Sequence, residues 1–110
     1  MSPLEFQVQL FLANIKEAIT KGNFFVVDRD KNNSFLAMTG MMPKERERII
    51  LSLESNHYIG GPRPDHSNPN EDIWEFKIRY NDKDLYIKLK LVLISGKYIG
   101  KCLSFHECEK

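Results

Sequence analysis

The chain has 110 residues, of which 42% are hydrophobic and 28% are charged, a composition typical of one soluble globular domain. It contains no run of about 18 apolar residues, which excludes a membrane-spanning helix, and its first residues lack the order of a signal peptide. The formal net charge is only +1, but residues 73–106 hold seven Lys or Arg against three Asp or Glu, a local charge of +4. We therefore expect a cytoplasmic protein with one basic region, and Cys102 and Cys108 as reduced thiols.

Helices are expected in the N-terminal half. Ser2 to Glu5 has the spacing of a capping box with Pro at the first helical position, and apolar residues at helical spacing follow it. Phe24 to Val27 is a short apolar run, either a strand or a buried edge segment. The expected helices cover residues 2–21, 30–38 and 43–53, the last with Ile49, Ile50 and Leu53 inward.

Residues 73–106 predict a small antiparallel meander with strands over 73–80, 84–94 and 98–106. Along each strand apolar and polar residues alternate, which indicates one apolar face and one polar face. Residues 54–72 contain GGPRPD and SNPNED and predict an irregular loop. The fold class is thus α+β, a single domain over 1–110 with a helical part (about 2–53), a loop and a sheet. The polar face is expected to carry Glu75, Lys77, Arg79, Tyr86, Lys88, Lys90, Cys102, Ser104 and His106.

The two turns of the meander determine which polar residues lie opposite each other. We expect Asp82-Lys83 as the central pair of the first turn, and a three-residue second turn at Ser95-Gly96-Lys97. Lys101 then falls on the apolar face, either as an end-of-sheet residue or as a sign of a β-bulge. The expected opposite pairs are Arg79–Tyr86, Lys77–Lys88, Glu75–Lys90, Lys88–Ser104 and Tyr86–His106. Lysine opposite lysine is destabilising, and a bound anion such as phosphate would relieve it.

The order of motifs over residues 24–108 resembles the MqsR-like toxins of the RelE-type ribonuclease superfamily of bacterial toxin–antitoxin systems. These motifs are FVVDRDKNNSFLAMTGM, a helix ending in ILSL, the segment YIGGPRPD, Trp74, the strand YIKLK and the final SFH. The resemblance implies a RelE-like fold, with helices on one face of a small antiparallel sheet. It also implies a metal-independent mRNA endoribonuclease that a cognate antitoxin neutralises, with a functional Tyr86. The chain departs from the best-known member at Ile59, Glu75 and His106, where that member has Lys, Gln and Lys.

Cleaving RNA without a metal requires a base for the 2′-OH, cations for the phosphorane charge and an acid for the 5′-oxygen. We expect Glu75 or His106 as the base, and His106 as the better acid because its unperturbed pKa lies near neutrality. Tyr86 is expected to donate a hydrogen bond or a proton once neighbouring cations lower its pKa, and Lys88 to stabilise charge. The expected substrate-binding residues are Lys77, Arg79, Lys90, Ser104 and Arg63. We expect no metal and no cofactor.

A second hypothesis remains open from the sequence alone. A stripe of Lys, Glu and Arg on a strand is by default the wet side of a half-exposed sheet. The same basic face then serves a non-catalytic module that binds RNA, the ribosome or a protein. The partners expected for the toxin are mRNA, free or on the ribosome, and an antitoxin protein, with no membrane. The free protein is expected to be a monomer or weak dimer.

Overall fold

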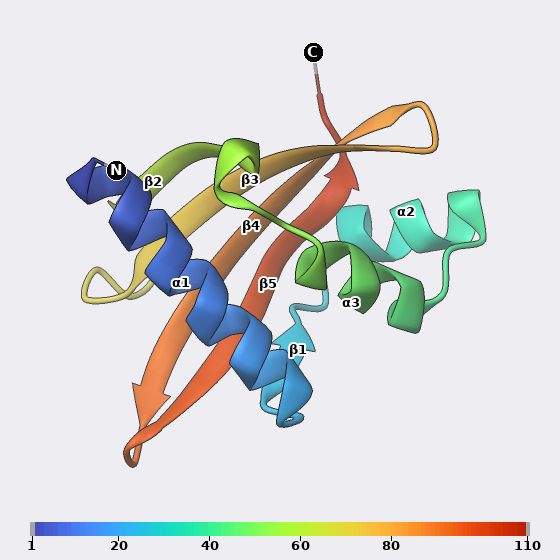
Figure 1. The fold of residues 1–110 in the computed structure, drawn as a ribbon. Helices are drawn as coiled ribbons and strands as arrows, with labels where there is room; N and C mark the ends of the chain where they lie inside the picture. Colours follow the sequence, from blue (N-terminus) through green and yellow to red (C-terminus); the bar gives the residue numbers. More distant parts are fainter. Residues whose placement is uncertain (1, 110) are drawn as a thin grey trace.

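The structure, a computed structural model, describes residues 2–109 (Figure 1). Within this range, three α-helices and a short 3-10 helix accompany five strands, so the predicted α+β class is confirmed. In chain order the elements are α1 (Pro3–Thr20), β1 (Phe24–Val26), α2 (Asp30–Thr39), α3 (Pro43–Leu51), η1 (Ser55–His57), β2 (Tyr58–Pro64), β3 (Asp72–Tyr80), β4 (Lys83–Ile94) and β5 (Lys97–Glu107).

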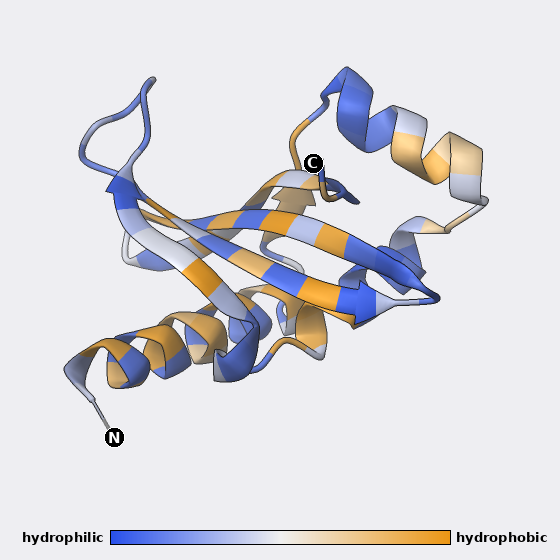
Figure 2. Ribbon diagram, turned by 90° about the horizontal axis from the view of Figure 1, so that it is seen from above, coloured by the Kyte–Doolittle hydropathy of each residue, from blue (hydrophilic) through white to orange (hydrophobic). Residues whose placement is uncertain are grey.

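The five strands form one sheet in the order β1-β5-β4-β3-β2. Strands β2 to β5 are antiparallel, but β1 runs parallel to β5, so the sheet is mixed rather than purely antiparallel as predicted. In Figure 1, α1 and α3 lie over one face and α2 stands beside the end of β5. Figure 2 shows hydrophobic and hydrophilic residues alternating along the strands above α1.

Helix α1 forms where the capping pattern places it. The Ser2 hydroxyl accepts a hydrogen bond from the Glu5 N–H at 3.1 Å, which satisfies one of the free donors of the first turn. One stripe of the helix is buried against the sheet, and Phe11 stacks on Trp74 at 5.1 Å between ring centroids. This stripe and the inward residues of α3, β3, β4 and β5 make a single apolar core.

The expected irregular loop over 54–72 is wrong, because β2 lies inside it. Tyr58–Pro64 pairs with β3 at the edge of the sheet, with two shifts of register along its length. Gly and Pro are rare in central strands, but an edge strand needs hydrogen bonds on one side only and tolerates them. The glycine and proline residues that indicated a loop therefore mark an irregular edge strand.

The first hairpin has a different register from the one predicted. The turn residues are Asn81 and Asp82, both with positive φ (49° and 64°), so Tyr80 pairs with Lys83. Positive φ at both central positions is typical of the type I′ turn that fits the twist of a hairpin. The observed pairs are Glu75–Lys88, Lys77–Tyr86 and Arg79–Asp84. The shift from the prediction is two residues, so the face is preserved while each pair changes.

The second hairpin contains a β-bulge. Its turn is the two-residue Ser95-Gly96 rather than the expected three-residue loop, since Ile94 pairs with Lys97. Between Lys88 and Leu89 the register shifts, and Leu103 is the extra residue of β5. This bulge gives the predicted Lys88–Ser104 and Tyr86–His106 pairs, which are confirmed.

The bulge also changes which residues of β5 face the core. Lys101 lies opposite Lys90, on the polar side. Its apparent position on the apolar face was therefore a sign of the bulge, the second of the two predicted explanations. Cys102 lies opposite Leu89 and is fully buried in the core, so its predicted place on the polar face is wrong. Burial raises the pKa of the Cys102 thiol to about 12, which keeps it protonated and inert at neutral pH.

A buried asparagine in the first turn of α2 holds the bulge. The Asn32 Nδ2 group donates to the carbonyl of Leu103 and to that of Val27, each at 3.1 Å. The Asn32 Oδ1 atom accepts from the Phe105 N–H at 3.0 Å. With 1% of its surface exposed, Asn32 ties β1, α2 and the bulged part of β5 into one unit.

Replacing Asn32 by Ala should lower the free energy of unfolding by about 2–3 kcal/mol, because buried backbone groups lose their partners. Asn33→Ala is the matched control, since Asn33 is exposed and bonds only the exposed Asp28 side chain. That control should change stability by less than about 0.5 kcal/mol. Urea unfolding measures both, and equal midpoints for the two variants would contradict the role given to Asn32.

Candidate functional site

The polar face of the sheet contains a hollow with a volume of about 730 Å³. Its strand residues alternate with core residues such as Ile87, so the hollow lies on the face away from α1. The start of α2 and the chain after β5 close its sides. The lining residues are Arg29, Asp30, Lys31, Asn32, Ile59, Lys77, Tyr86, Lys88, Ser104, His106, Cys108 and Glu109.

Five of the nine predicted site residues line this hollow together. They come from three adjacent strands, and the pairs Lys77–Tyr86, Tyr86–His106 and Lys88–Ser104 place them side by side. Glu75 and Arg63 join them through contacts described next, whereas Arg79 and Lys90 do not line the hollow. The five are Lys77, Tyr86, Lys88, Ser104 and His106.

Tyr86, Glu75 and Arg63 form a polar chain beside the hollow. The Tyr86 hydroxyl donates to Glu75 Oε2, and Arg63 forms an ion pair with Glu75 Oε1. Burial of the phenol, then its hydrogen bond to the Glu75 carboxylate and the charge of that carboxylate, raise the pKa of Tyr86 well above its ordinary value. The expected lowering of this pKa by cations is therefore wrong. Tyr86 remains a neutral hydrogen-bond donor.

One ring nitrogen of His106 contacts the backbone. Its Nδ1 atom lies 2.9 Å from the Glu107 carbonyl oxygen, and because a carbonyl can only accept, Nδ1 carries the hydrogen in this contact. The Nε2 atom takes no part in this contact. The centroids of the His106 and Tyr86 rings are 5.7 Å apart, so the imidazole and the phenol lie next to each other in the hollow.

The cations of the site fall into two groups. Within residues 2–109, neither Lys77 nor Lys88 pairs with a carboxylate, so both can hold an anion in the hollow. Arg79 instead pairs with Asp84 at 3.3 Å near the turn. Lys31 pairs with Glu109 at the rim, through side chains that are about two-thirds exposed, and such pairs contribute little to stability.

The start of α2 is the part of the site that sequence reasoning missed. Arg29, Lys31 and Asn32 line the hollow, although the sequence pattern predicted there only a short apolar run and a helix over 30–38. The parallel pairing of β1 with β5 brings them there, and this pairing joins segments far apart in the chain. One feature of the sequence could have indicated this part of the site, namely two cations, Arg29 and Lys31, at the start of a predicted helix.

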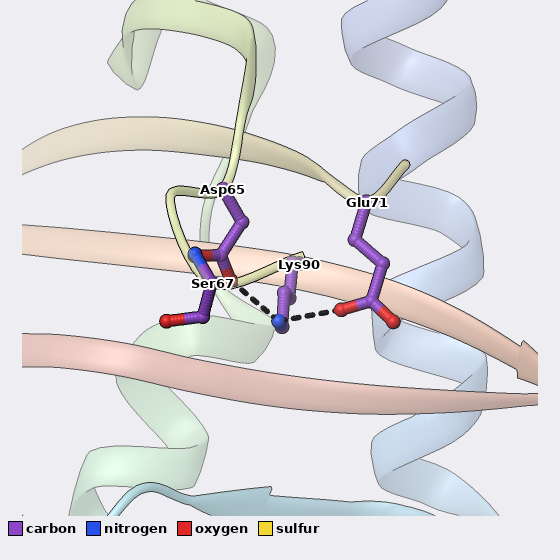
Figure 3. A network of polar contacts seen from close by, with 4 residues as sticks. All are labelled: Asp65, Ser67, Glu71 and Lys90. Carbon is purple, nitrogen blue, oxygen red and sulfur yellow. Dashed lines mark hydrogen bonds and ion pairs between the residues drawn. The ribbon is translucent and has the colours of Figure 1, made fainter. Parts of the chain in front are cut away.

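Lys90 is buried in a clamp away from the hollow (Figure 3). Its Nζ atom lies 2.7 Å from Asp65 Oδ2 and 2.7 Å from Glu71 Oε1, and its side chain is 4% exposed. Burial disfavours the charge, but the two carboxylates outweigh it and raise the pKa of Lys90. The Lys90 ammonium and the Ser67 N–H hold the pKa of Asp65 below its usual value. Lys90 thus fixes the 65–71 segment, and its paired, buried ammonium is not open to substrate, contrary to the prediction.

The described residues 2–109 contain no group of three or more His, Cys, Asp or Glu side chains placed to hold a metal ion. Within the same range, no helix is both long enough and apolar enough to cross a bilayer. A scan against protein-family models finds no match for this chain, and a search of curated proteins finds no significant match. The resemblance to MqsR-like toxins therefore rests on the ordered motifs of the sequence.

Lys90→Met should lower the free energy of unfolding by about 3 kcal/mol at neutral pH, because it leaves two partly buried carboxylates without their cation. Since the pKa of folded Asp65 is lowered, the clamp contributes above the ordinary range of Asp and is lost as pH falls through the folded value. The difference from wild type should shrink on acidification. Urea unfolding across pH tests this.

Lys97→Met, at an exposed lysine of the last hairpin, is the control for this change. It should alter stability by less than about 0.5 kcal/mol at every pH. A loss from Lys90→Met that matches the control, or that stays constant on acidification, would contradict the clamp.

Proposed function

We propose that the protein is a toxin-type, metal-independent endoribonuclease of the MqsR-like group, which cleaves mRNA by attack of the 2′-OH and is neutralised by a cognate antitoxin. The observation that carries this proposal is the common hollow of Tyr86, Lys88, Ser104 and His106, with the Glu75 carboxylate bonded to Tyr86. These groups supply an imidazole, a carboxylate, a neutral phenol and a cation within one small surface. Metal-free RNA cleavage requires a base, an acid and a group that stabilises the phosphorane charge, and this set of side chains can supply all three.

The geometry favours separate roles for these side chains. His106 Nε2 is the general acid that protonates the departing 5′-oxygen, since Nδ1 is held by the Glu107 carbonyl. Lys88 and Lys77 bind the scissile phosphate and stabilise its developing charge. Tyr86 donates a hydrogen bond as a neutral phenol.

Glu75 is the base in this scheme, with one condition. Its Oε2 atom accepts a hydrogen bond from the Tyr86 hydroxyl, whereas its buried Oε1 atom is ion-paired with Arg63 and accepts no hydrogen bond. To act as base, Glu75 must accept the 2′-OH hydrogen in place of the phenolic one, which frees Tyr86 to turn toward the phosphate. Arg63, expected to bind substrate, instead holds Glu75 in this scheme. Ser104 lines the site of the phosphate. Arg79, near the turn, is at most a peripheral contact.

The occupied carboxylate also favours a second candidate function. A Glu75 that never exchanges its partners leaves a basic hollow that binds without cleaving. The protein is then a module for RNA, the ribosome or a protein partner. Intact RNA bound in a salt-dependent manner is the property that distinguishes this candidate.

Inducing the wild-type protein in a bacterial host should arrest growth and produce discrete new 5′ ends in primer extension on total RNA. His106→Ala should reduce cleavage by about 10²–10⁴-fold, because it removes an acid–base group. Tyr86→Phe should reduce it by about 10²-fold or more, through loss of a hydrogen-bond donor to the developing charge.

His66→Ala and Tyr98→Phe are the matched controls, since both residues are exposed and lie outside the hollow. They should arrest growth like the wild type. A soluble, folded wild-type protein that leaves growth and RNA unchanged would overturn the toxin proposal in favour of the binding module.

A further inference from the structure

An exposed aromatic ring lies on β1, next to the hollow. Phe25 is 51% exposed, an unusual amount for a phenylalanine in a strand. The Lys101 Nζ atom lies 5.5 Å from the centroid of its ring, in cation–π contact. Its neighbour Phe24 packs against the core, so the two rings point to opposite sides of the sheet.

The register places Phe25 on the face that carries the hollow. Phe25 pairs with Lys101, Lys101 pairs with Lys90, and Lys90 is two residues from Lys88 on the same strand. Paired residues share a face, and so do residues two apart on a strand. Phe25, Lys101 and the hollow residue Lys88 therefore line one continuous side of the sheet.

The charge around this ring suits a polyanion. Arg29 follows β1 and lines the hollow, so a cation lies on the chain between Phe25 and the site. The carboxylates of Asp65 and Glu71 are both paired with Lys90, the strand neighbour of Lys101. An exposed ring flanked by cations is the arrangement with which proteins bind single-stranded nucleic acid, by stacking bases and holding phosphates.

We propose that Phe25 stacks an unpaired base of single-stranded RNA and that Lys101 binds an adjacent phosphate, one or two nucleotides from the phosphate in the hollow. The inference rests on the proposed function in that RNA occupies the hollow. It adds a substrate class, since a base inside a duplex cannot reach an exposed ring. It also defines a second subsite that contributes to binding rather than to chemistry.

The test is binding of a fluorescent RNA oligonucleotide, with 2′-O-methyl groups throughout so that it cannot be cleaved. Phe25→Ala should weaken the affinity about tenfold, the value of one stacked base, and Phe25→Trp should retain it. Phe6→Ala is the matched control, because Phe6 is 58% exposed on α1, across the sheet. It should bind like the wild type, and thermal unfolding should show that all three variants are folded.

Salt dependence tests Lys101 separately. Lys101→Gln should reduce the slope of log affinity against log salt by about 0.7, the value for one phosphate contact on a single strand. Lys44→Gln, at an exposed lysine of α3, should leave the slope unchanged.

Failure of this inference is distinguishable from failure of the proposed function. If the wild type cleaves RNA and Phe25→Ala binds the oligonucleotide as tightly as the wild type, the stacking subsite is wrong and the ribonuclease stands. The same conclusion follows if a duplex of the same sequence binds as tightly as the single strand. A wild type that neither binds nor cleaves RNA overturns both proposals and leaves a protein partner for this face.

Discussion

The buried amide of Asn32 is the contact on which the candidate site depends. It donates to the carbonyl of Val27, the first residue after β1, and to that of the bulge residue Leu103, and it accepts from the Phe105 N–H beyond the bulge. Without the bulge, a two-residue turn at Ser95-Gly96 would place the polar residues at the end of β5 on the core face. One side chain thus couples the position of α2 to the face on which Ser104 and His106 appear.

In the resulting site, the side chains of Tyr86 and Glu75 are held by their neighbours in states that are not yet reactive. Tyr86 is a neutral phenol because its pKa is raised, and Glu75 is held between that phenol and Arg63. In the proposed ribonuclease, the contacts of Glu75 with Tyr86 and Arg63 must change when substrate binds. Because Arg63 belongs to β2, this change involves the edge strand.

The sequence predicted what depends on local pattern. Strand alternation placed Lys77, Tyr86, Lys88, Ser104 and His106 on one face, and the capping pattern at Ser2 located α1. Contacts between distant segments were missed. Local composition could not show that Lys90 is buried by a loop 19 to 25 residues away, or that β1 joins β5 in parallel. Glycine and proline concealed β2, because their effect depends on whether a strand is central or at an edge.

The most direct test of the proposed chemistry is analysis of the ends of RNA cut by the purified protein in EDTA. Attack by the 2′-OH predicts 2′,3′-cyclic phosphate and 5′-hydroxyl ends, formed without metal, and no cut where the 2′-OH is replaced by hydrogen. Ends with a 3′-hydroxyl and a 5′-phosphate, or cleavage that EDTA abolishes, would contradict an active site built from Glu75, Tyr86, Lys88 and His106.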